Sequence, residues 1–308
     1  MQSIGKHKIH MEWLNPRFGY FYTLNRKLRE AQTRFQKLKL YETDEFGRVM
    51  MLDGITQVAE SCEYQYHEPM VHPALCTHPR PESVLVIGAG DGGIVREVCK
   101  YPCVKEVHLA ELDDGVVAFA KKYLTSIHQH CFSDPRLQVH ITDGRAYVQN
   151  NPGRFDAVIM DMTDPFGPSK MLYTREFFRE VKRSLRSRAG VFAMHTESPI
   201  TRPDTFACIQ KTLRASFNEV RPFYQYIQMY AVLWSISVSS DGSNPAALSA
   251  AAIDKKLARY KIKDLRLYNG PVHTAAQVAY PYVQEILKRP TTVITDKKPN
   301  IPDEVIHD

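Results

Sequence analysis

Five acidic residues follow apolar stretches of the sequence, at positions that could bring them together at one site: Asp91, Glu111, Asp143, Asp161 and Asp164. Asp91 stands inside a glycine-rich turn, in the stretch VLVIGAGDGGIVREV at residues 84–98. Turns of this kind offer backbone N–H groups to a phosphate, which the fixed charge of Asp91 would repel. The turn therefore predicts a nucleoside without phosphates, and Asp91 favours a nucleoside that carries positive charge.

The same turn leaves two other enzyme classes open. Gly88, Gly90 and Gly93 fit the dinucleotide-binding pattern GxGxxG, but in an NAD(P) enzyme Asp91 would stand where the pyrophosphate must lie. A methyltransferase that uses intact S-adenosylmethionine is the nearer alternative. Asp91 would repel the carboxylate of that donor, whereas decarboxylated S-adenosylmethionine carries only sulfonium and ammonium charges, and its amine can pair with Asp91.

Two further carboxylates fit the recognition of a nucleoside. Glu111 stands about 20 residues after the glycine turn, where a carboxylate accepts both ribose hydroxyls. An acid that begins a helix is the other interpretation, and it suits the neighbouring Asp113 and Asp114 better. Asp143 and Gly144 follow the next strand, where folds of this class recognise adenine; a plain Asp-Gly turn explains them equally well.

The stretch DMTDPFGP at residues 161–168 carries a second pair of acids, Asp161 and Asp164, in a turn stiffened by two prolines. Two carboxylates on a stiff loop suit the capture of a cation and the removal of a proton. Because crowded acids raise each other's pKa, one of them can act as a base near neutral pH. Capping of the helix expected near Tyr173 would explain one of the acids and less easily both.

Apolar strands alternate with amphipathic helices around these acids. We expect strands at 83–89, 104–112, 137–143, 155–162 and 190–195, and helices at 91–101, 113–124, 144–151 and 175–185. Strands that are apolar throughout predict a parallel sheet covered by helices on both faces. The fold class is therefore α/β, a Rossmann-like doubly wound sheet whose strand ends would gather the five acids.

A small antiparallel β domain is expected to precede this sheet, because residues 38–43, 48–53 and 55–60 alternate between turns. Residues 19–35 look irregular. The proline-rich stretch at 78–83 divides the chain into a β domain, 1–77, and a catalytic domain, 78–308. Its C-terminal extension is expected to hold one helix, two strands around 219–240, a helical portion and an irregular tail from residue 290.

Composition narrows the class of protein. The net charge of +6 in 308 residues is spread over 40 basic and 34 acidic residues, and no basic run predicts binding to nucleic acid. No stretch resembles a signal peptide or a membrane span. Six cysteines without paired spacing predict reduced thiols in a cytoplasmic protein, and the histidines form no metal-binding motif.

The ordered motifs resemble one family, the polyamine aminopropyltransferases or spermidine synthases, and especially its bacterial members. The likeness runs from about Phe18 to Pro281 and is carried by FGRVMMLDGITQ, EYQYHE, HPALCTHPRP, VLVIGAGDGGIVREV, AELD, TDGR, DMTDPFGP and LYNGPVHTAA. The resemblance implies transfer of an aminopropyl group from decarboxylated S-adenosylmethionine, as co-substrate, to an amine, which releases methylthioadenosine. It also implies a homodimer or homotetramer with no permanently bound cofactor and no metal.

The resemblance also implies the roles of individual residues. The donor would contact Gln36, Gly88, Asp91, Glu111, Asp143, Gly144 and Pro168, with the ribose at Gln36 and Glu111, the adenine at Asp143 and Gly144, and the aminopropyl ammonium at Asp91. Asp161 would be the general base. The polyamine would lie along Tyr66, His67, Asp91, Asp164 and Tyr230; taken alone, Tyr66 and His67 would be packing residues between domains.

Two segments depart from the family pattern: HTESPI at 195–200, and QMYAVLW at 228–234, where bulky Val232, Leu233 and Trp234 replace small residues. Both are expected to border the far end of the acceptor channel, unless the changes are neutral drift. Putrescine, giving spermidine, is the favoured acceptor. Cadaverine, agmatine, diaminopropane and spermidine stay open, as does a non-catalytic polyamine-binding paralogue.

Overall fold

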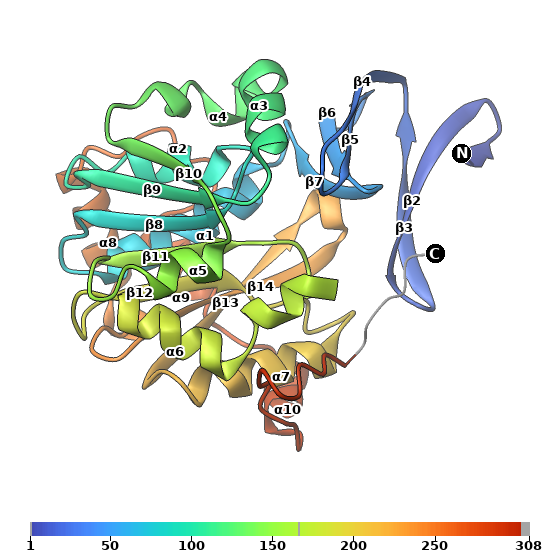
Figure 1. Cartoon of the computed structure of the whole chain (residues 1–308). Helices are drawn as coiled ribbons and strands as arrows, with labels where there is room; N and C mark the ends of the chain where they lie inside the picture. The colour runs from blue at the N-terminus through green and yellow to red at the C-terminus, as the bar shows by residue number, and fades with distance from the viewer. Residues whose placement is uncertain (1, 166, 303–308) are drawn as a thin grey trace.

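A seven-stranded sheet forms the centre of the molecule (Figure 1). The structure is a computed structural model that describes residues 2–165 and 167–302, without the side chains of Gln2 and Pro168. The strand order is β10 (Leu137–Ile141), β9 (Glu106–Glu111), β8 (Ser83–Gly88), β11 (Ala157–Asp161), β12 (Val191–His195), β14 (Val232–Ser240) and β13 (Glu219–Ile227). The first five strands run parallel, and β14 and β13 are antiparallel additions at one edge. The predicted Rossmann-like sheet is confirmed.

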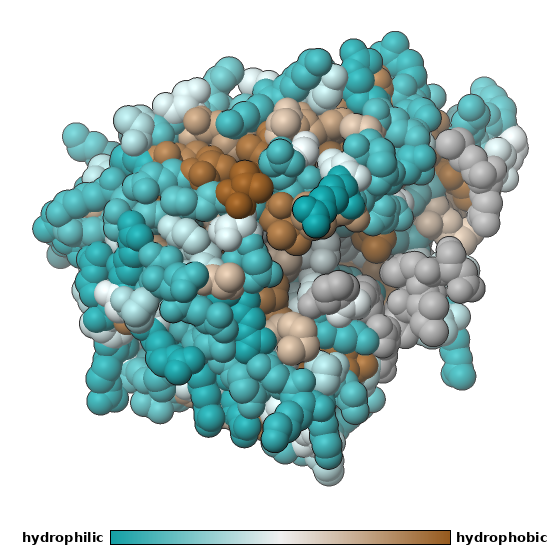
Figure 2. Space-filling model, in the orientation of Figure 1, coloured by the Kyte–Doolittle hydropathy of each residue, from teal (hydrophilic) through white to brown (hydrophobic). Residues whose placement is uncertain are grey.

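Helices cover both faces of this sheet because successive residues of each strand point to opposite sides. Val84 and Val86 of β8 pack in one core, together with helices α1 (Tyr64–Thr77) and α2 (Gly93–Cys99). Leu85 and Ile87 face the other core, with α6 (Arg175–Ser184) and α7 (Pro203–Arg214). Outside these layers, hydrophilic side chains cover most of the face that Figure 2 shows.

The N-terminal region consists of two antiparallel sheets. One holds β1 (Gln2–Ile4), β2 (His7–Asn15) and β3 (Phe18–Leu24), and the other holds β4 (Arg26–Gln32), β5 (Lys37–Thr43), β6 (Gly47–Leu52) and β7 (Ile55–Ala59). The expected strands within 38–60 are confirmed. The expectation that residues 19–35 are irregular was wrong: they form most of β3 and all of β4, an exposed edge strand whose polar sequence lacks clear alternation.

Helix α1 connects the two regions. It precedes the predicted domain boundary at residue 78, and it packs against α2 and against β12 and β13 of the large sheet. Leu38 and Leu40 of β5 share a core with Val116 and Phe119 of α3 (Asp114–Tyr123). The small sheet is therefore held beside the carboxyl edge of the large sheet, where the acids were predicted to gather.

Short helices complete the structure. They are α4 (Thr125–His128), η1 (Cys131–Ser133), α5 (Gly144–Gln149), η2 (Gly167–Leu172), η3 (Gln228–Tyr230), η4 (Pro245–Ala247), α8 (Ala250–Arg259), α9 (Gly270–Ala275) and α10 (Pro281–Lys288). The predicted helical C-terminal portion is confirmed, and residues 290–302 contain neither helix nor strand; the rest of the predicted tail, 303–308, lies outside the described residues. Among the described residues, no helix is long and apolar enough to span a membrane.

Gly88 yields a testable prediction about the edge of the sheet. Its φ is +75°, and a Cβ atom there would lie 2.0 Å from the backbone oxygen of Asp161. Gly88→Ala should therefore lower the melting temperature through both backbone strain and overpacking. Gly153→Ala is the matched control, because Gly153 also has a positive φ, +64°, but open space around its Cβ position.

We expect Gly88→Ala to cost roughly 1–3 kcal/mol more than the control, which corresponds to several degrees in melting temperature. Equal melting temperatures for the two variants, measured by circular dichroism, would show that the contact between β8 and β11 does not require a glycine.

Candidate active site

A cavity of about 590 Å³ lies at the carboxyl edge of the large sheet. Ten of the predicted site residues line it: Gln36, Tyr66, His67, Gly88, Asp91, Glu111, Asp143, Asp161, Asp164 and Tyr230. Gly144 is not among the lining residues, and a Cβ atom there would lie 2.4 Å from the side chain of Ile87 of β8. The side chain of Pro168 lies outside the described part of the structure. The expected gathering of acids at one edge is thus present.

Asp161 ends β11 and lies deep in the cavity. Its Oδ1 accepts a hydrogen bond of 2.7 Å from the hydroxyl of Tyr66, which comes from α1. Burial raises the pKa of Asp161 to about 6, with a further contribution from the charge of Asp91 and opposition from Tyr66 and His67. Near neutral pH this carboxylate is largely ionised, yet it binds a proton much more readily than an exposed aspartate.

Asp91 is held ionised although it is buried. Its Oδ1 accepts a hydrogen bond of 2.8 Å from the backbone N–H of Gly93, and its Oδ2 lies 3.5 Å from Nε2 of His67. Burial raises the pKa of Asp91, but His67 and the Gly93 N–H outweigh burial, so that the pKa falls below its usual value. A permanent negative charge therefore faces the cavity at the glycine turn.

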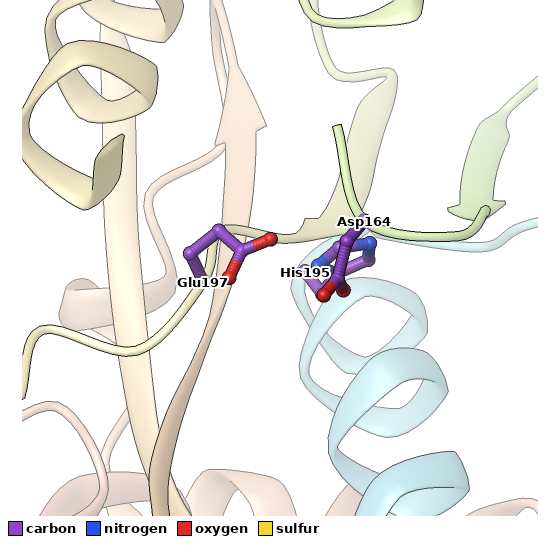
Figure 3. A group of neighbouring side chains, drawn as sticks. All are labelled: Asp164, His195 and Glu197. Carbon is purple, nitrogen blue, oxygen red and sulfur yellow. The ribbon is translucent and has the colours of Figure 1, made fainter. Parts of the chain in front are cut away.

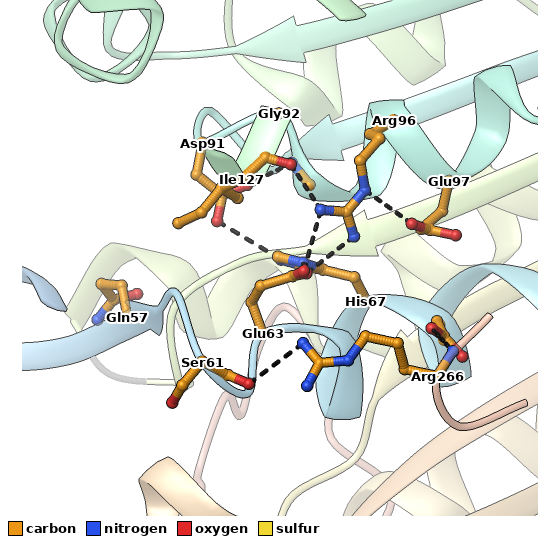
Figure 4. A network of polar contacts seen from close by, with 12 residues as sticks. Gln57, Ser61, Glu63, His67, Asp91, Gly92, Arg96, Glu97, Ile127 and Arg266 are labelled. Carbon is orange, nitrogen blue, oxygen red and sulfur yellow. Dashed lines mark hydrogen bonds and ion pairs between the residues drawn. The ribbon is translucent and has the colours of Figure 1, made fainter. Parts of the chain in front are cut away.

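His67 is the positively charged partner of Asp91. Its Nδ1 lies 2.5 Å from Glu63, one helical turn earlier in α1. Burial lowers the pKa of His67, but Asp91 and Glu63 more than compensate and raise it to about 10. The ring is therefore an imidazolium held between two carboxylates, as Figure 4 shows.

Arg96 of α2 stabilises Glu63, which in turn contacts His67. Its guanidinium donates to Glu63 at 2.8 Å, to Glu97 at 2.7 Å and to the backbone oxygen of Ile127 at 2.6 Å (Figure 4). The side chains of Arg96, Glu63 and Glu97 are buried, and buried charges are stable only when they are paired. Our sequence reasoning missed Glu63 and Arg96, although both stand within motifs that carried the resemblance, EYQYHE and VLVIGAGDGGIVREV.

Asp113 organises the side of the cavity where the sequence predicts a nucleoside. Glu111 ends β9, and its Oε1 accepts a hydrogen bond of 2.9 Å from the Asp113 N–H. The amide of Gln36 donates to Asp113 at 3.0 Å, and Asp113 caps α3 by accepting from Gly115. Burial raises the pKa of Glu111 to about 7, with a smaller contribution from nearby acids. Asp113 thus takes the helix-starting role that the sequence suggested for it.

Asp143, for which the sequence suggested either adenine recognition or a plain Asp-Gly turn, lies at the start of helix α5. It lines the cavity, and its Oδ1 also accepts a hydrogen bond of 2.8 Å from the N–H of Ala146. This hydrogen bond caps α5 at its first turn. The side chain is exposed, so a ligand at this side of the cavity can reach it.

Asp164 belongs to a separate charged cluster. Its Oδ2 lies 2.8 Å from Nη1 of Arg202, which also lies 3.2 Å from Glu197. Figure 3 shows Asp164 beside His195, with Glu197 opposite. Side-chain ligand atoms of these three lie within 4.8 Å of one another, a spacing that a metal ion could use. The guanidinium of Arg202 already bridges the two carboxylates, so an ion would have to displace it.

Aromatic rings join the two acidic regions of the cavity. The ring centroid of Tyr230 lies 6.1 Å from that of Tyr66 and 5.4 Å from that of Trp234, which stacks on His195 at 5.7 Å. The segments 195–200 and 228–234, which depart from the family pattern, therefore both reach the cavity, through His195, Tyr230 and Trp234. Of the bulky residues 232–234, only Trp234 lines it.

The N-terminal strand β2 also contributes Glu12, Trp13 and Leu14 to the cavity wall. Sequence reasoning did not find these residues, because nothing in a partly exposed strand indicates that it lies beside acids that stand about 80 residues or more along the chain. Asn15 donates to the backbone oxygen of Thr201 at 3.3 Å, and this contact ties the strand to the segment that precedes α7.

Comparisons with known proteins agree with this architecture. The model for the spermine/spermidine synthase domain matches residues 63–249, and the model for the spermidine synthase tetramerisation domain matches residues 9–60. A polyamine aminopropyltransferase of Nitrosomonas europaea is 41% identical over 286 residues, which cover 93% of this chain and 88% of the relative. Another, from Bacillus subtilis, is 33% identical over 272 residues, covering 88% and 95%.

Solved structures show the same likeness. A spermidine synthase in complex with the transition-state analogue AdoDATO has a TM-score of 0.85 and 33% identity, covering 92% of this chain and 95% of that one. The spermidine synthase of Thermotoga maritima has a TM-score of 0.83 and 31% identity, covering 92% and 94%. Sequence, fold and cavity thus agree that this chain belongs to the spermine/spermidine synthase family of aminopropyltransferases.

Proposed function

We propose that this chain transfers the aminopropyl group of decarboxylated S-adenosylmethionine to putrescine, which yields spermidine and methylthioadenosine, with Asp161 as the general base. The observation that carries the proposal is the pair of carboxylates in one cavity. Asp91 is held ionised by His67, whereas the pKa of Asp161 is raised to about 6. One can bind a cation permanently and the other can exchange a proton.

The donor is assigned by charge and position. Its aminopropyl ammonium would pair with Asp91, and its ribose would lie against Glu111, with Gln36 supporting through Asp113. The adenine would lie toward Asp143 and the neighbouring Gly144 and Pro168. Intact S-adenosylmethionine would place a carboxylate near Asp91, which disfavours a methyltransferase.

The reaction needs one proton acceptor from the protein. An aliphatic amine has a pKa near ~10 and arrives protonated, so Asp161 takes a proton before or as the nitrogen attacks. The new C–N bond forms at the carbon beside the sulfonium, and the C–S bond breaks with its electron pair moving to sulfur. The protein supplies position and charge rather than a nucleophile.

A homo-oligomer is part of the proposal. Its support is the match of residues 9–60 to a tetramerisation domain, and both a dimer and a tetramer fit that match.

The product identifies the reaction. Purified protein, decarboxylated donor and a panel of putrescine, cadaverine, agmatine, diaminopropane and spermidine should give, by mass spectrometry, an amine heavier by one aminopropyl group together with methylthioadenosine. Putrescine should be used best. Gain of a methyl group from intact S-adenosylmethionine would contradict the proposal, and no methylthioadenosine with any amine would indicate a non-catalytic binding protein.

The raised pKa of Asp161 predicts how kcat/KM depends on pH. Because the base must be ionised and its pKa is about 6, kcat/KM should fall as the pH decreases through that value. Asp161→Asn should reduce turnover by about 10²–10⁴-fold, leave the dissociation constant of the donor within about threefold, and abolish this limb of the profile. Asp44→Asn, in an exposed turn outside the cavity, is the matched control. It should retain the wild-type turnover and the fall of kcat/KM at low pH. Near-normal turnover in Asp161→Asn would remove Asp161 from the base role.

A further inference from the structure

The C-terminal segment after α10 packs on the large domain close to the cavity. Residues 290–302 lie outside the ranges 9–60 and 63–249 that match the family models. The side chain of Ile294 is 1% exposed and belongs to the same core as the apolar faces of α6 and α7. Its backbone oxygen accepts from the N–H of Arg175 at 2.9 Å, and its N–H donates to Oγ1 of Thr212 at 3.0 Å. The segment is therefore fixed against α6 and α7.

Two residues after Ile294, Asp296 binds a residue of the cavity wall, Arg145 of α5. The guanidinium of Arg145 donates to Asp296 at 2.7 and 3.1 Å and to Glu180 of α6 at 2.7 and 2.9 Å. Its fifth N–H donates to the backbone oxygen of Met171 at 3.4 Å. A guanidinium held by two carboxylates, each through two hydrogen bonds, has one defined position. All five of its N–H groups are engaged within the protein.

The contacts of Asp296 and Arg145 converge on one part of the wall. Met171 and Leu172, at the end of η2, line the cavity together with Arg145. Asp296 holds this region at a second point, because Oγ1 of Thr174 donates to its Oδ1 at 2.6 Å. Thr174 caps α6 and stands two residues after Leu172. The C-terminal segment thus links the start of α5 to the end of η2.

We propose that Asp296 is a positioning residue for donor binding, which acts through Arg145 to hold the wall at Met171 and Leu172 in the shape that the adenosyl group needs. The inference rests on the proposed function, in which the adenine lies toward Asp143, two residues before Arg145. With the wall held, the site is formed before the donor arrives. Without this contact only a fraction of the molecules has the competent wall, and the dissociation constant rises by the inverse of that fraction.

Calorimetry with two ligands that share the adenosyl group, decarboxylated S-adenosylmethionine and methylthioadenosine, tests this role. Asp296→Ala should raise both dissociation constants about tenfold and by the same factor, because the wall faces the part that both ligands contain. At saturating donor the bound ligand restores the wall, so kcat should stay within about threefold of wild type. Lys297→Ala, at the exposed neighbouring position, is the matched control and should bind both ligands as wild type does. Unchanged dissociation constants in Asp296→Ala contradict the proposal.

A double variant shows whether Asp296 acts through Arg145. Arg145→Met should itself weaken both ligands, and Asp296→Ala added to it should change the dissociation constants by less than about twofold. An undiminished effect of Asp296→Ala in that background contradicts the role.

A milder variant keeps the test decisive should Asp296→Ala not fold. Asp296→Asn keeps the size of the side chain and loses its charge, and it should still weaken both ligands about threefold or more. Wild-type affinity in Asp296→Asn overturns the role. Wild type that binds neither ligand would contradict the proposed function, and this inference with it, whereas wild type that binds both while the variants equal it overturns this inference alone.

Discussion

The structure depends on keeping negative charge buried at the carboxyl edge of the sheet. A carboxylate removed from water would take up a proton unless a cation or hydrogen-bond donors stabilise its charge. At Asp91 this stabilisation comes from His67, which is itself held between two acids and supported by Arg96 through Glu63. Helices α1 and α2 must pack closely for these contacts to form, and the glycine at 93 allows it, because a Cβ there would lie 2.1 Å from the His67 ring.

Environment gives three carboxylates of one cavity different properties. The pKa of Asp91 lies below its usual value, that of Asp161 is raised to about 6, and that of Glu111 is raised to about 7. Desolvation raises the pKa of each of the three, so the difference lies in their partners: an imidazolium, a tyrosine hydroxyl and a backbone N–H. Such a separation of pKa values suits a site in which one group binds a cation and another transfers a proton.

Much of the site could be predicted because its residues follow strands. Asp91, Glu111 and Asp161 each stand at the carboxyl end of a strand whose apolar sequence is easy to recognise, and parallel strands bring such ends together. Tyr66 and Gln36 came only from resemblance, since neither position carries a local signal. Strand β4 was missed because it is exposed and its polar sequence does not alternate, and β3 was missed because its aromatic sequence, FGYFYTL, does not alternate between apolar and polar residues.

The remaining site residues could not be predicted because tertiary packing alone brings them to the cavity. Glu63 and Arg96 lie behind the first layer of side chains, and their role depends on the distance between two helices. Arg202 faces Asp164 from a loop 38 residues later in the chain. Trp13 reaches the cavity from a sheet that shares no strand with the large one. Sequence spacing does not encode such contacts, although HTESPI, which contains Glu197, did stand out as unusual.

The central claim is that the charge of Asp91 selects a donor without a carboxylate. Calorimetric dissociation constants for decarboxylated and for intact S-adenosylmethionine, with wild type and with Asp91→Asn, test it most directly. Wild type should bind the decarboxylated donor about tenfold or more tightly than the intact one, and Asp91→Asn should remove most of this preference. Equal affinity of wild type for both donors, or a preference that survives in Asp91→Asn, would contradict the account.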